Sequence, residues 1–414
     1  MTTRLYLADS HLKECRARVL SLEDAEGGFD AVLDRTVFFP NAGGQPCDTG
    51  TLRFAGGTAA VTGADERGGD VVHHLSRAVP PGTEVEAQID WARRFDHMQQ
   101  HTGEHLLSYA AYTLFDAVNV GFHLSGQYGT IDLDRPLDAA QLGAIERRAN
   151  ELLCRDLPVT AACFDSEEAL ARAGLPLRKH AEGLTAPIRI VSIEGADCCT
   201  CCAPHCARTG EIGQIFLADA IPWKGGVRVT FLCGLRALDH ARRTHDALDA
   251  IARRFSTGRE SAPAAVQKQF DDMAALRRRE RALAARCNEY LAAELRAGAE
   301  PAGRAALVAR LVDAPGDRLR ELAAQALCGS MLMLLLASDG ARVQYVLRRS
   351  DDLPLDMGEL CQAVNAALGG KGGGRGALAQ GSAPAQAALD ETLAQLRAYL
   401  MQRLRAREGR MAVI

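Results

Sequence analysis

FDHMQQHTGEHLLSYAAYTLF, residues 95–115, is predicted to be a helix, and it begins where a strand-rich sequence gives way to a mixed one. On a helix, His101 and His105 lie four residues apart, so both imidazoles share one face and can reach the same metal ion. His97 extends this face and leaves the choice of the ligand pair open. The spacing also fits the HxxEH pattern of inverted metallopeptidases, in which Glu104 would be the general base. The remaining ligands therefore decide between two kinds of site.

The sequence before this helix is typical of strands. Short apolar runs such as FDAVLDRTVFFP, GTLRFAGGTAAVTGA and TEVEAQID alternate with Gly, Asp and Pro turn signals. This pattern favours a small barrel or sandwich, and we expect a β-barrel-like domain at residues 1–90. Residues 91–235 add helices such as DAAQLGAIERRANELLCRD to strands such as APIRIVSI and VRVTFLCG, which predicts an α+β domain.

The second half of the chain has a helical pattern first and a mixed one later. Residues 236–310 carry apolar residues at three- and four-residue spacing in two stretches joined by STGRESAP, so we expect a helical hairpin that acts as a linker or a dimerisation element. Arg277, Arg278 and Arg279 on it form either a solvated face or an RNA contact. Residues 311–414 are predicted to form a compact C-terminal α/β domain with a glycine-rich loop, GGKGGGRG. The fold class expected for the whole chain is α+β.

Composition and charge exclude some classes of protein. The formal net charge of −4 gives no basic surface over the whole molecule, although a local stripe could still bind RNA. MTTRLYLADSHLKEC at the start lacks the apolar segment of a secretory signal. The longest apolar run, SMLMLLLASDG, is too short to span a bilayer, and we expect it to form a buried strand. The thirteen cysteines then indicate reduced thiols and a metal site rather than disulfides. We expect a cytoplasmic protein without a membrane contact.

A second cluster of possible metal ligands is DCCTCCAPHCARTGEIG, residues 197–213. Thiolate and imidazole are the ligands that zinc prefers, and Cys201 and His205 have CxxxH spacing here. Two half-sites, one from each stretch, would make one tetrahedral site, with Glu104 orienting a ligand rather than acting as a base. The peptidase interpretation is disfavoured because Cys and His replace the distant carboxylate of an HxxEH site. The alternative is a self-contained zinc knuckle that uses Cys198 or Cys199, Cys201 or Cys202, and His205.

Four ordered stretches of the chain resemble the free-standing alanyl-tRNA editing proteins of the AlaX family. Each stretch alone is weak, but their order is specific, and together they cover nearly the whole chain. Proteins of this family are similar to the editing and C-terminal parts of alanyl-tRNA synthetase without the aminoacylation domain. The stretches are RTVFFPNAGGQPCDTGTL (35–52), MQQHTGEHLLS (98–108), CCAPHCARTGEIG (201–213) and GGKGGGRGALAQG (369–381).

The resemblance implies a zinc-dependent hydrolase, an aminoacyl-tRNA deacylase that removes serine or glycine wrongly attached to tRNA(Ala). The family's HxxxH and CxxxH pairs fall on His101, His105, Cys201 and His205, which would hold one Zn²⁺ per chain. This assignment leaves out His97 and the other cysteines.

The NAGGQ segment is either a plain hairpin turn or, as the resemblance implies, part of the editing pocket. Gly43 and Gly44 would then allow close backbone approach to the substrate. Gln45 would supply an amide near the ester and would take part in catalysis together with the two helical histidines. Thr36, in the strand before the turn, would supply the hydroxyl that recognises serine.

The glycine cluster lacks the GxxxxGK[ST] pattern of a phosphate loop. It resembles the C-terminal domain that editing proteins share with DHH-type phosphodiesterases, but no DHH catalytic motif precedes it. We therefore expect an RNA-contacting module in which Lys371 and Arg375 bind tRNA. A homodimer through the hairpin or through this domain is a further expectation.

One departure from the family pattern concerns specificity. Many relatives have CGGTH where this chain has CCAPH, so Cys202, Ala203 and Pro204 replace two glycines and a threonine. A substrate contact made by that threonine or by flexible backbone would be absent here, which leaves the choice between Ser-tRNA(Ala) and Gly-tRNA(Ala) open. The alternatives to an editing enzyme are a zinc-stabilised tRNA-binding protein without catalysis and, less favoured, the HxxEH metallopeptidase.

Overall fold

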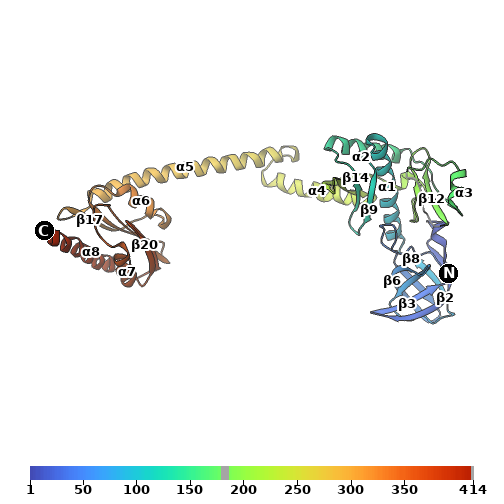
Figure 1. Cartoon of the computed structure of the whole chain (residues 1–414), viewed down its shortest axis with the longest axis horizontal. Coiled ribbons are helices and arrows are strands. Elements are labelled where there is room, and N and C mark those ends of the chain that lie inside the picture. The colour runs from blue at the N-terminus through green and yellow to red at the C-terminus, as the bar shows by residue number, and fades with distance from the viewer. Residues whose placement is uncertain (179–185, 412–414) are drawn as a thin grey trace. The chain divides into compact units, whose positions relative to one another are not determined.

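The computed structural model describes residues 1–178 and 186–411, which fall into two compact units, Met1–Arg254 and Phe255–Ile414 (Figure 1). The first unit contains the strand-rich region and the helix with the histidine pair. The second contains a six-stranded sheet. None of the helices in these described ranges combines the length and the apolar character needed to cross a membrane.

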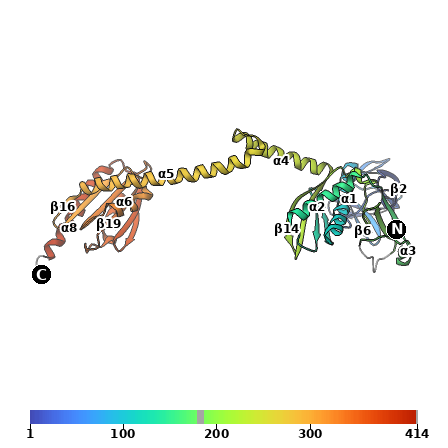
Figure 2. The same ribbon diagram turned by 90° about the horizontal axis from the view of Figure 1, so that it is seen from above.

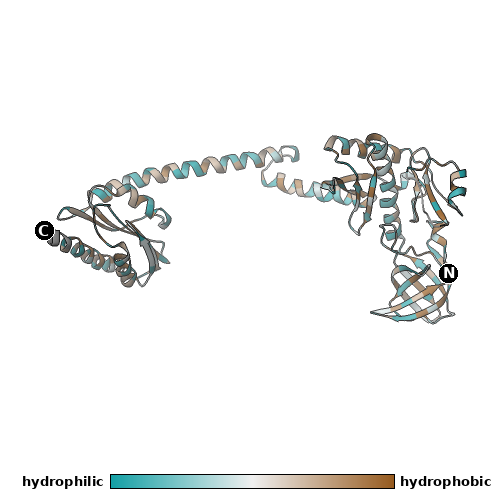
Figure 3. Cartoon of the chain, viewed as in Figure 1, coloured by the Kyte–Doolittle hydropathy of each residue, from teal (hydrophilic) through white to brown (hydrophobic). Residues whose placement is uncertain are grey.

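Six strands at the N-terminal end of the first unit close into a barrel. Side chains along each strand alternate between the interior and the solvent, so that Val19, Leu33, Leu52 and Val61 are almost completely buried. Figure 3 shows the same alternation of apolar and polar residues along the barrel ribbons. The small barrel predicted from turn signals and short apolar runs is therefore confirmed. Its strands, in barrel order, are β2 (Glu14–Ala25), β3 (Gly28–Leu33), β7 (Asp70–Leu75), β6 (Gly57–Arg67), β5 (Gly50–Phe54) and β8 (Glu84–Ile89).

The helix α1 (Trp91–Phe115) follows the barrel directly and confirms the predicted helix. Asp90 caps its N-terminus by accepting a hydrogen bond from the Arg93 N–H at 3.2 Å, and Asp116 ends it in the left-handed conformation. The helix packs beside α2 (Ala139–Cys154), as Figure 2 shows, and against a four-stranded sheet. That sheet has the order β14 (Ile215–Trp223), β15 (Gly226–Cys233), β10 (Gly129–Leu133) and β9 (Asn119–Leu124).

A buried ion pair joins α1 to the barrel region. Arg94 and Asp48 are both fully buried, and Nε of Arg94 lies 3.1 Å and 3.0 Å from the two carboxylate oxygens. The remaining guanidinium groups donate to the carbonyl oxygens of Val37 (2.6 Å) and Ser10 (2.9 Å). Asp48 also accepts the N–H of Phe39 at 2.7 Å. Every charged group of the pair is thus hydrogen-bonded, as burial requires.

A three-stranded sheet presents the cysteine-rich stretch. The last of its strands ends at Thr200, so the chain leaves the sheet just before Cys201. Its order is β11 (Val159–Phe164), β12 (Ile188–Ile193) and β13 (Cys198–Thr200). The remaining elements of the first unit are β1 (Thr3–Arg4), β4 (Arg35–Thr36), α3 (Glu167–Arg172), and the short 3₁₀ helices η1 (Leu5–Leu7) and η2 (Thr209–Ile212).

Two helices occupy most of residues 236–310, as expected, but they belong to different units. The helix α4 (Gly234–Arg254) is part of the first unit, and after η3 (Arg259–Ser261) the helix α5 (Ala262–Ala297) is part of the second. The hairpin, and with it the domain boundaries at residues 90, 235 and 310, stay predictions.

The second unit is a six-stranded sheet covered on both faces. Along its strand β18 (Met331–Ser338), Leu332 and Leu334 pack in the core cluster that contains α7 and α8, whereas Met333 and Leu335 pack in the cluster that contains α6. Burial on both faces explains the continuous apolar run MLMLLLA, which was predicted to be a buried strand. The sheet order is β16 (Glu300–Ala302), β17 (Ala305–Leu311), β18, β19 (Arg342–Arg349), β21 (Leu378–Pro384) and β20 (Lys371–Arg375), and the helices are η4 (Gly316–Arg318), α6 (Leu319–Ala326), α7 (Met357–Leu368) and α8 (Leu389–Met411).

The predicted glycine-rich loop is wrong: KGGGR is the edge strand β20, paired antiparallel with β21. A Cβ atom on Gly372 would lie 2.4 Å from the Tyr345 hydroxyl, and one on Gly374 would lie 2.1 Å from the Leu378 carbonyl oxygen. Glycine is therefore needed for close strand approach rather than for a flexible loop.

Candidate metal centre

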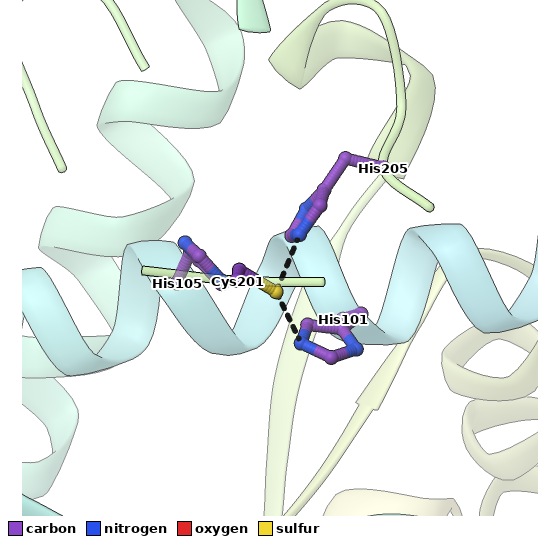
Figure 4. A group of neighbouring side chains, drawn as sticks. All are labelled: His101, His105, Cys201 and His205. Carbon is purple, nitrogen blue, oxygen red and sulfur yellow. Dashed lines mark hydrogen bonds between the residues drawn. The ribbon is translucent and has the colours of Figure 1, made fainter. Parts of the chain in front are cut away.

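Four side chains from two distant stretches converge in the first unit. His101 and His105 project from α1 toward Cys201 and His205 in the loop after β13 (Figure 4). One donor atom from each lies within 4.8 Å of the others. Sγ of Cys201 is 3.4 Å from Nε2 of His101 and 3.2 Å from Nε2 of His205. Three imidazoles and a thiol match the ligand types and the number of a tetrahedral zinc site, so these residues could hold a metal ion.

Each of the three imidazoles has its Nδ1 atom within hydrogen-bond distance of an oxygen atom. The tautomer that satisfies all three contacts carries its proton on Nδ1 and presents a lone pair at Nε2. Metal-binding histidines have such partners, which orient the ring and raise its basicity. The surroundings therefore fit a bound ion. The contacts are His101 Nδ1 to Gln45 Oε1 at 2.8 Å, His105 Nδ1 to Asp197 Oδ2 at 2.9 Å, and His205 Nδ1 to Thr102 Oγ1 at 3.1 Å.

The protonation states of Cys201 and His205 also suit a bound cation. Burial alone would raise the pKa of Cys201, but the neighbouring His101 and His205 hold this pKa well below its usual value and favour the thiolate. Burial lowers the pKa of His205 to about 3, so this imidazole is neutral at physiological pH. A thiolate and a neutral imidazole are the forms that bind metal.

A second group of possible ligands, His105, Asp197 and Cys199, lies on the Nδ1 side of His105. Arg178 already occupies this side, because its Nε donates to Oδ1 of Asp197 at 2.6 Å and its Nη2 lies 3.6 Å from the Cys199 sulfur. Burial opposes ionisation of Asp197, but His105 and Arg178 outweigh it and hold the pKa of this carboxyl well below the usual range. The guanidinium of Arg178 already provides a positive charge at this position. Asp197 and Cys199 therefore orient His105 rather than hold a second metal ion.

Arg189 fixes the loop that carries the other two ligands. Its Nη1 donates to the carbonyl oxygens of Cys201 (2.8 Å) and Ala203 (2.9 Å), and its Nε donates to that of Leu7 (3.3 Å). These bonds satisfy buried carbonyl groups that have no partner strand.

A cavity of about 640 Å³ opens beside the ligands. Its size lies in the range of small-molecule sites. His101, His105 and Cys201 form part of its wall, together with Gly43 and Phe122, and the centroid of the Phe122 ring lies 4.8 Å from that of His101. The cavity thus brings three possible metal ligands and an aromatic ring to the same space.

Comparisons with known proteins match three segments of the chain to family models. Residues 12–93 match the model described as "tRNA synthetases class II (A)" and residues 188–225 the model "Threonyl and Alanyl tRNA synthetase second additional domain". Residues 304–402 match the model "DHHA1 domain". The chain is similar to alanyl-tRNA editing proteins and to the corresponding part of alanine–tRNA ligases.

Individual relatives span most of the chain. The alanyl-tRNA editing protein Aarsd1 of Bos taurus is 36% identical over 61% of this chain and 58% of its own length. The alanine–tRNA ligase of Korarchaeum cryptofilum is 30% identical over 96% of this chain and 45% of its own length. The chain therefore spans about half the length of these relatives. The solved C-Ala domain of Aquifex aeolicus alanyl-tRNA synthetase matches 25% of the chain with 24% identity and a TM-score of 0.23.

The NAGGQ segment is a tight turn at the wall of the cavity. Ala42 and Gln45 exchange two backbone hydrogen bonds, and Gly43 and Gly44 between them have φ values of 58° and 77°. A Cβ on Gly44 would lie 2.5 Å from the carbonyl oxygen of Phe122. The segment is therefore a tight turn of which Ala42 and Gly43 line the cavity, and substrate contacts of Gly43, Gly44 and Gln45 stay predictions. Gln45 contacts His101, and among the described residues its buried Nε2 has no hydrogen-bond partner; its catalytic role stays a prediction.

Thr36, in contrast, is not among the described residues that line this cavity. It is fully buried, and its hydroxyl lies 2.8 Å from Nε2 of His73 and accepts the N–H of Phe38 at 3.0 Å. Nδ1 of His73 is 3.2 Å from the carbonyl oxygen of Ala31, and burial lowers the pKa of His73 to about 4, so Nε2 accepts from the threonine. The contact of Thr36 with a substrate serine stays a prediction without geometric support.

The other candidates lie apart from the four ligands. Within the described ranges, no group of possible metal ligands combines Cys198 or Cys202 with His205, so the knuckle is not formed. His97 is buried, and burial lowers its pKa to about 4. In the second unit, Lys371 and Arg375 are exposed at the two ends of β20, and their contact with tRNA stays a prediction.

Two functional residues were missed in the sequence. Asp197, which holds His105, directly precedes the cysteine cluster, and an acid beside possible zinc ligands was a usable signal. Arg178 gave no signal, because only folding brings it to Asp197. Glu104, expected to orient a ligand, instead accepts hydrogen bonds from Ser108 (2.5 Å) and Asn119 (2.7 Å).

Proposed function

We propose that this protein is a zinc-dependent hydrolase that removes serine or glycine from mischarged tRNA(Ala). The observation that carries the proposal is the convergence of three Nε2 atoms and one thiolate beside a cavity of about 640 Å³. Kinship with an alanyl-tRNA editing protein supports the choice of substrate. The ligand set argues against a peptidase, because a cysteine and a histidine stand where an HxxEH site has a carboxylate.

The roles of individual residues follow from their contacts. His101, His105, Cys201 and His205 would hold the ion, which as a Lewis acid polarises an ester carbonyl. Gln45 keeps the Nε2 atom of His101 turned toward the site through the bond to Nδ1.

Hydrolysis adds water across the ester. The bond between the carbonyl carbon and the ribose oxygen breaks, the amino acid keeps the new oxygen as a carboxylate, and the ribose oxygen takes a proton. Gly43, whose position is set by the turn, and Phe122 limit the room for the amino-acid side chain. Cys202, which also lines the cavity and whose Sγ would lie 3.6 Å from a Cβ on Gly43, replaces one of the family glycines. We propose that Gly43, Phe122 and Cys202 set the preference between serine and glycine.

The deciding experiment is a deacylation assay. Ser-tRNA(Ala), Gly-tRNA(Ala) and Ala-tRNA(Ala) are incubated separately with the zinc-loaded full chain, and ester loss is followed by acid precipitation. We expect hydrolysis of at least one of the first two and much slower hydrolysis of the third. Binding of all three without hydrolysis would instead support a zinc-stabilised tRNA-binding protein.

The metal is tested separately by elemental analysis. About one zinc per chain is expected in the wild type, and Cys201→Ala should lose it, because three imidazoles no longer complete a tetrahedral set. Cys202→Ala is the matched control and should keep it. Full zinc in the Cys201 variant would favour a knuckle.

We also propose that the second unit binds the tRNA backbone through Lys371 and Arg375. Lys371 borders a hollow that Arg320 also lines, which places two cations together in this unit. Neutralising Lys371 and Arg375 to alanine should weaken tRNA binding and flatten its salt dependence by about two counterions. Unchanged affinity and slope would exclude this role. A cytoplasmic location and a homodimer remain parts of the proposal.

A further inference from the structure

Glu104 is a buried carboxylate at the wall of the cavity, one residue before a metal ligand. Glu104 is only 5% exposed and lines the cavity. Oε1 accepts hydrogen bonds from the Ser108 hydroxyl (2.5 Å) and from Nδ2 of Asn119 (2.7 Å), and these two donors also contact each other at 2.9 Å. The network fixes the plane of the carboxylate. These hydrogen bonds involve Oε1 and not Oε2.

Oε2, the second oxygen, takes part in neither of these bonds. It lies 3.8 Å from Nε2 of His105, the nitrogen that faces the metal position. Orientation of His105 is already the task of Asp197, which contacts the opposite ring nitrogen. Glu104 therefore presents a carboxylate oxygen beside the place where the ester carbonyl would lie.

The other charged side chains around the cavity indicate which kind of substrate group Oε2 of Glu104 would attract. Arg4 and Glu66 line the cavity as an ion pair with 2.7 Å between Nη2 and Oε1, so that acid is already neutralised. Arg178 and Arg189 also line the wall and would repel a cation at their own positions. Arg178 also attracts Glu104, but its guanidinium is bound to Asp197 at 2.6 Å. A cationic group of the substrate would thus be attracted to Glu104.

An aminoacyl ester carries such a group. Its α-ammonium is attached to the carbon next to the reacting carbonyl, so it must lie close to any residue beside that carbonyl. We propose that Oε2 of Glu104 accepts a hydrogen bond from the α-ammonium group, and that the site thereby selects esters with a free amino group. This inference rests on the proposed deacylase activity.

The test compares two nearly isosteric substrates. Seryl-tRNA(Ala) has an α-ammonium, and its deaminated analogue, glyceryl-tRNA(Ala), has a hydroxyl at the same carbon. Loss of a charged hydrogen bond at a buried site predicts that the wild type prefers the first by about 10- to 100-fold in kcat/KM. Glu104→Gln should remove most of this preference by slowing only seryl-tRNA(Ala). Glu151→Gln, on the exposed side of α2, is the matched control and should change neither rate.

The outcomes separate the possible roles of this carboxylate. Equal slowing of both substrates by Glu104→Gln would make it a general base and overturn the proposal, and loss of zinc from that variant would make it a ligand and also overturn it. If the variant does not fold, the wild-type preference decides, because a wild type that hydrolyses both esters equally contradicts the proposal alone. A wild type that hydrolyses neither contradicts the proposed function itself.

Discussion

The first unit contains two buried arginine–aspartate pairs that differ in what lies next to them. Arg94 and Asp48 are both fully buried, and their remaining groups end on backbone atoms such as the Val37 carbonyl. Arg178 and Asp197 are nearly as buried, but the carboxylate continues to His105 and the guanidinium lines the cavity.

The difference shows how one chemical pair serves two purposes. In the Arg94–Asp48 pair, which we call the closed pair, every remaining polar group is bound to backbone atoms. This pair therefore joins α1 to the barrel region and only adds specificity to the packing. A pair that ends on the imidazole of His105 acts on a proposed metal ligand. The consequences of disrupting the two pairs should therefore appear in different measurements.

The largest effect is expected at the closed pair. Arg94→Met leaves the Asp48 carboxylate buried without a counter-ion, which should lower the free energy of unfolding by about 3–5 kcal/mol. Urea denaturation of the zinc-loaded protein measures it. Arg18→Met, which breaks the exposed pair with Glu84, is the control and should cost far less, because solvent screens this pair. Equal losses in the two variants would contradict the assignment of Arg94.

At the Arg178–Asp197 pair, which we call the open pair, we expect a smaller loss of stability but a clear loss of metal affinity. Asp197→Asn removes the charge that holds the Nδ1 proton of His105, so zinc affinity should fall about 10- to 100-fold, as competition with a chromophoric chelator would measure. Asp48→Asn is the matched control, and its folded fraction should keep wild-type affinity. The distinction between the pairs fails if both variants bind zinc equally well.

The smallest effect is expected where a carboxylate–histidine contact lies near the surface. His74 lies between Asp30 (2.6 Å) and Asp65 (2.9 Å) on the barrel. Burial alone would lower the pKa of His74, but Asp65 and Asp30 outweigh it and raise this pKa. Because the pKa is raised in the folded state, the contact stabilises fully below the unfolded pKa of about 6.5 and is lost as pH rises through the folded value.

His74→Gln should therefore reduce stability by at most about 1 kcal/mol near pH 5.5, and by less near pH 8.5. Urea midpoints of variant and wild type at both pH values give the difference. A loss that grows with pH would show that the imidazole is not stabilised as a cation.

How far the sequence predicts this molecule depends on the range of the interaction. Local patterns were sufficient for the barrel strands, for α1 and for the buried strand at residues 331–338, because side-chain periodicity reports burial directly. The four ligands came from spacing and family resemblance, but Asp197 and Arg178 act through contacts that only tertiary folding creates. The glycine-rich segment was misjudged because glycine permits both loops and close strand packing. Thr36 was placed by analogy, and its bond to His73 depends on barrel closure that no local pattern reveals.

The distance along the chain between the two halves of the metal site has a consequence for synthesis. Cys201 follows His101 by 100 residues. At elongation rates of about 5–20 residues per second, the ribosome needs about 5–20 seconds to make that interval. During this time α1 offers only two of the four proposed ligands, and the full set forms only when the cysteine loop has emerged and docked. Uptake of the proposed zinc would therefore be a late event in the synthesis of the first unit.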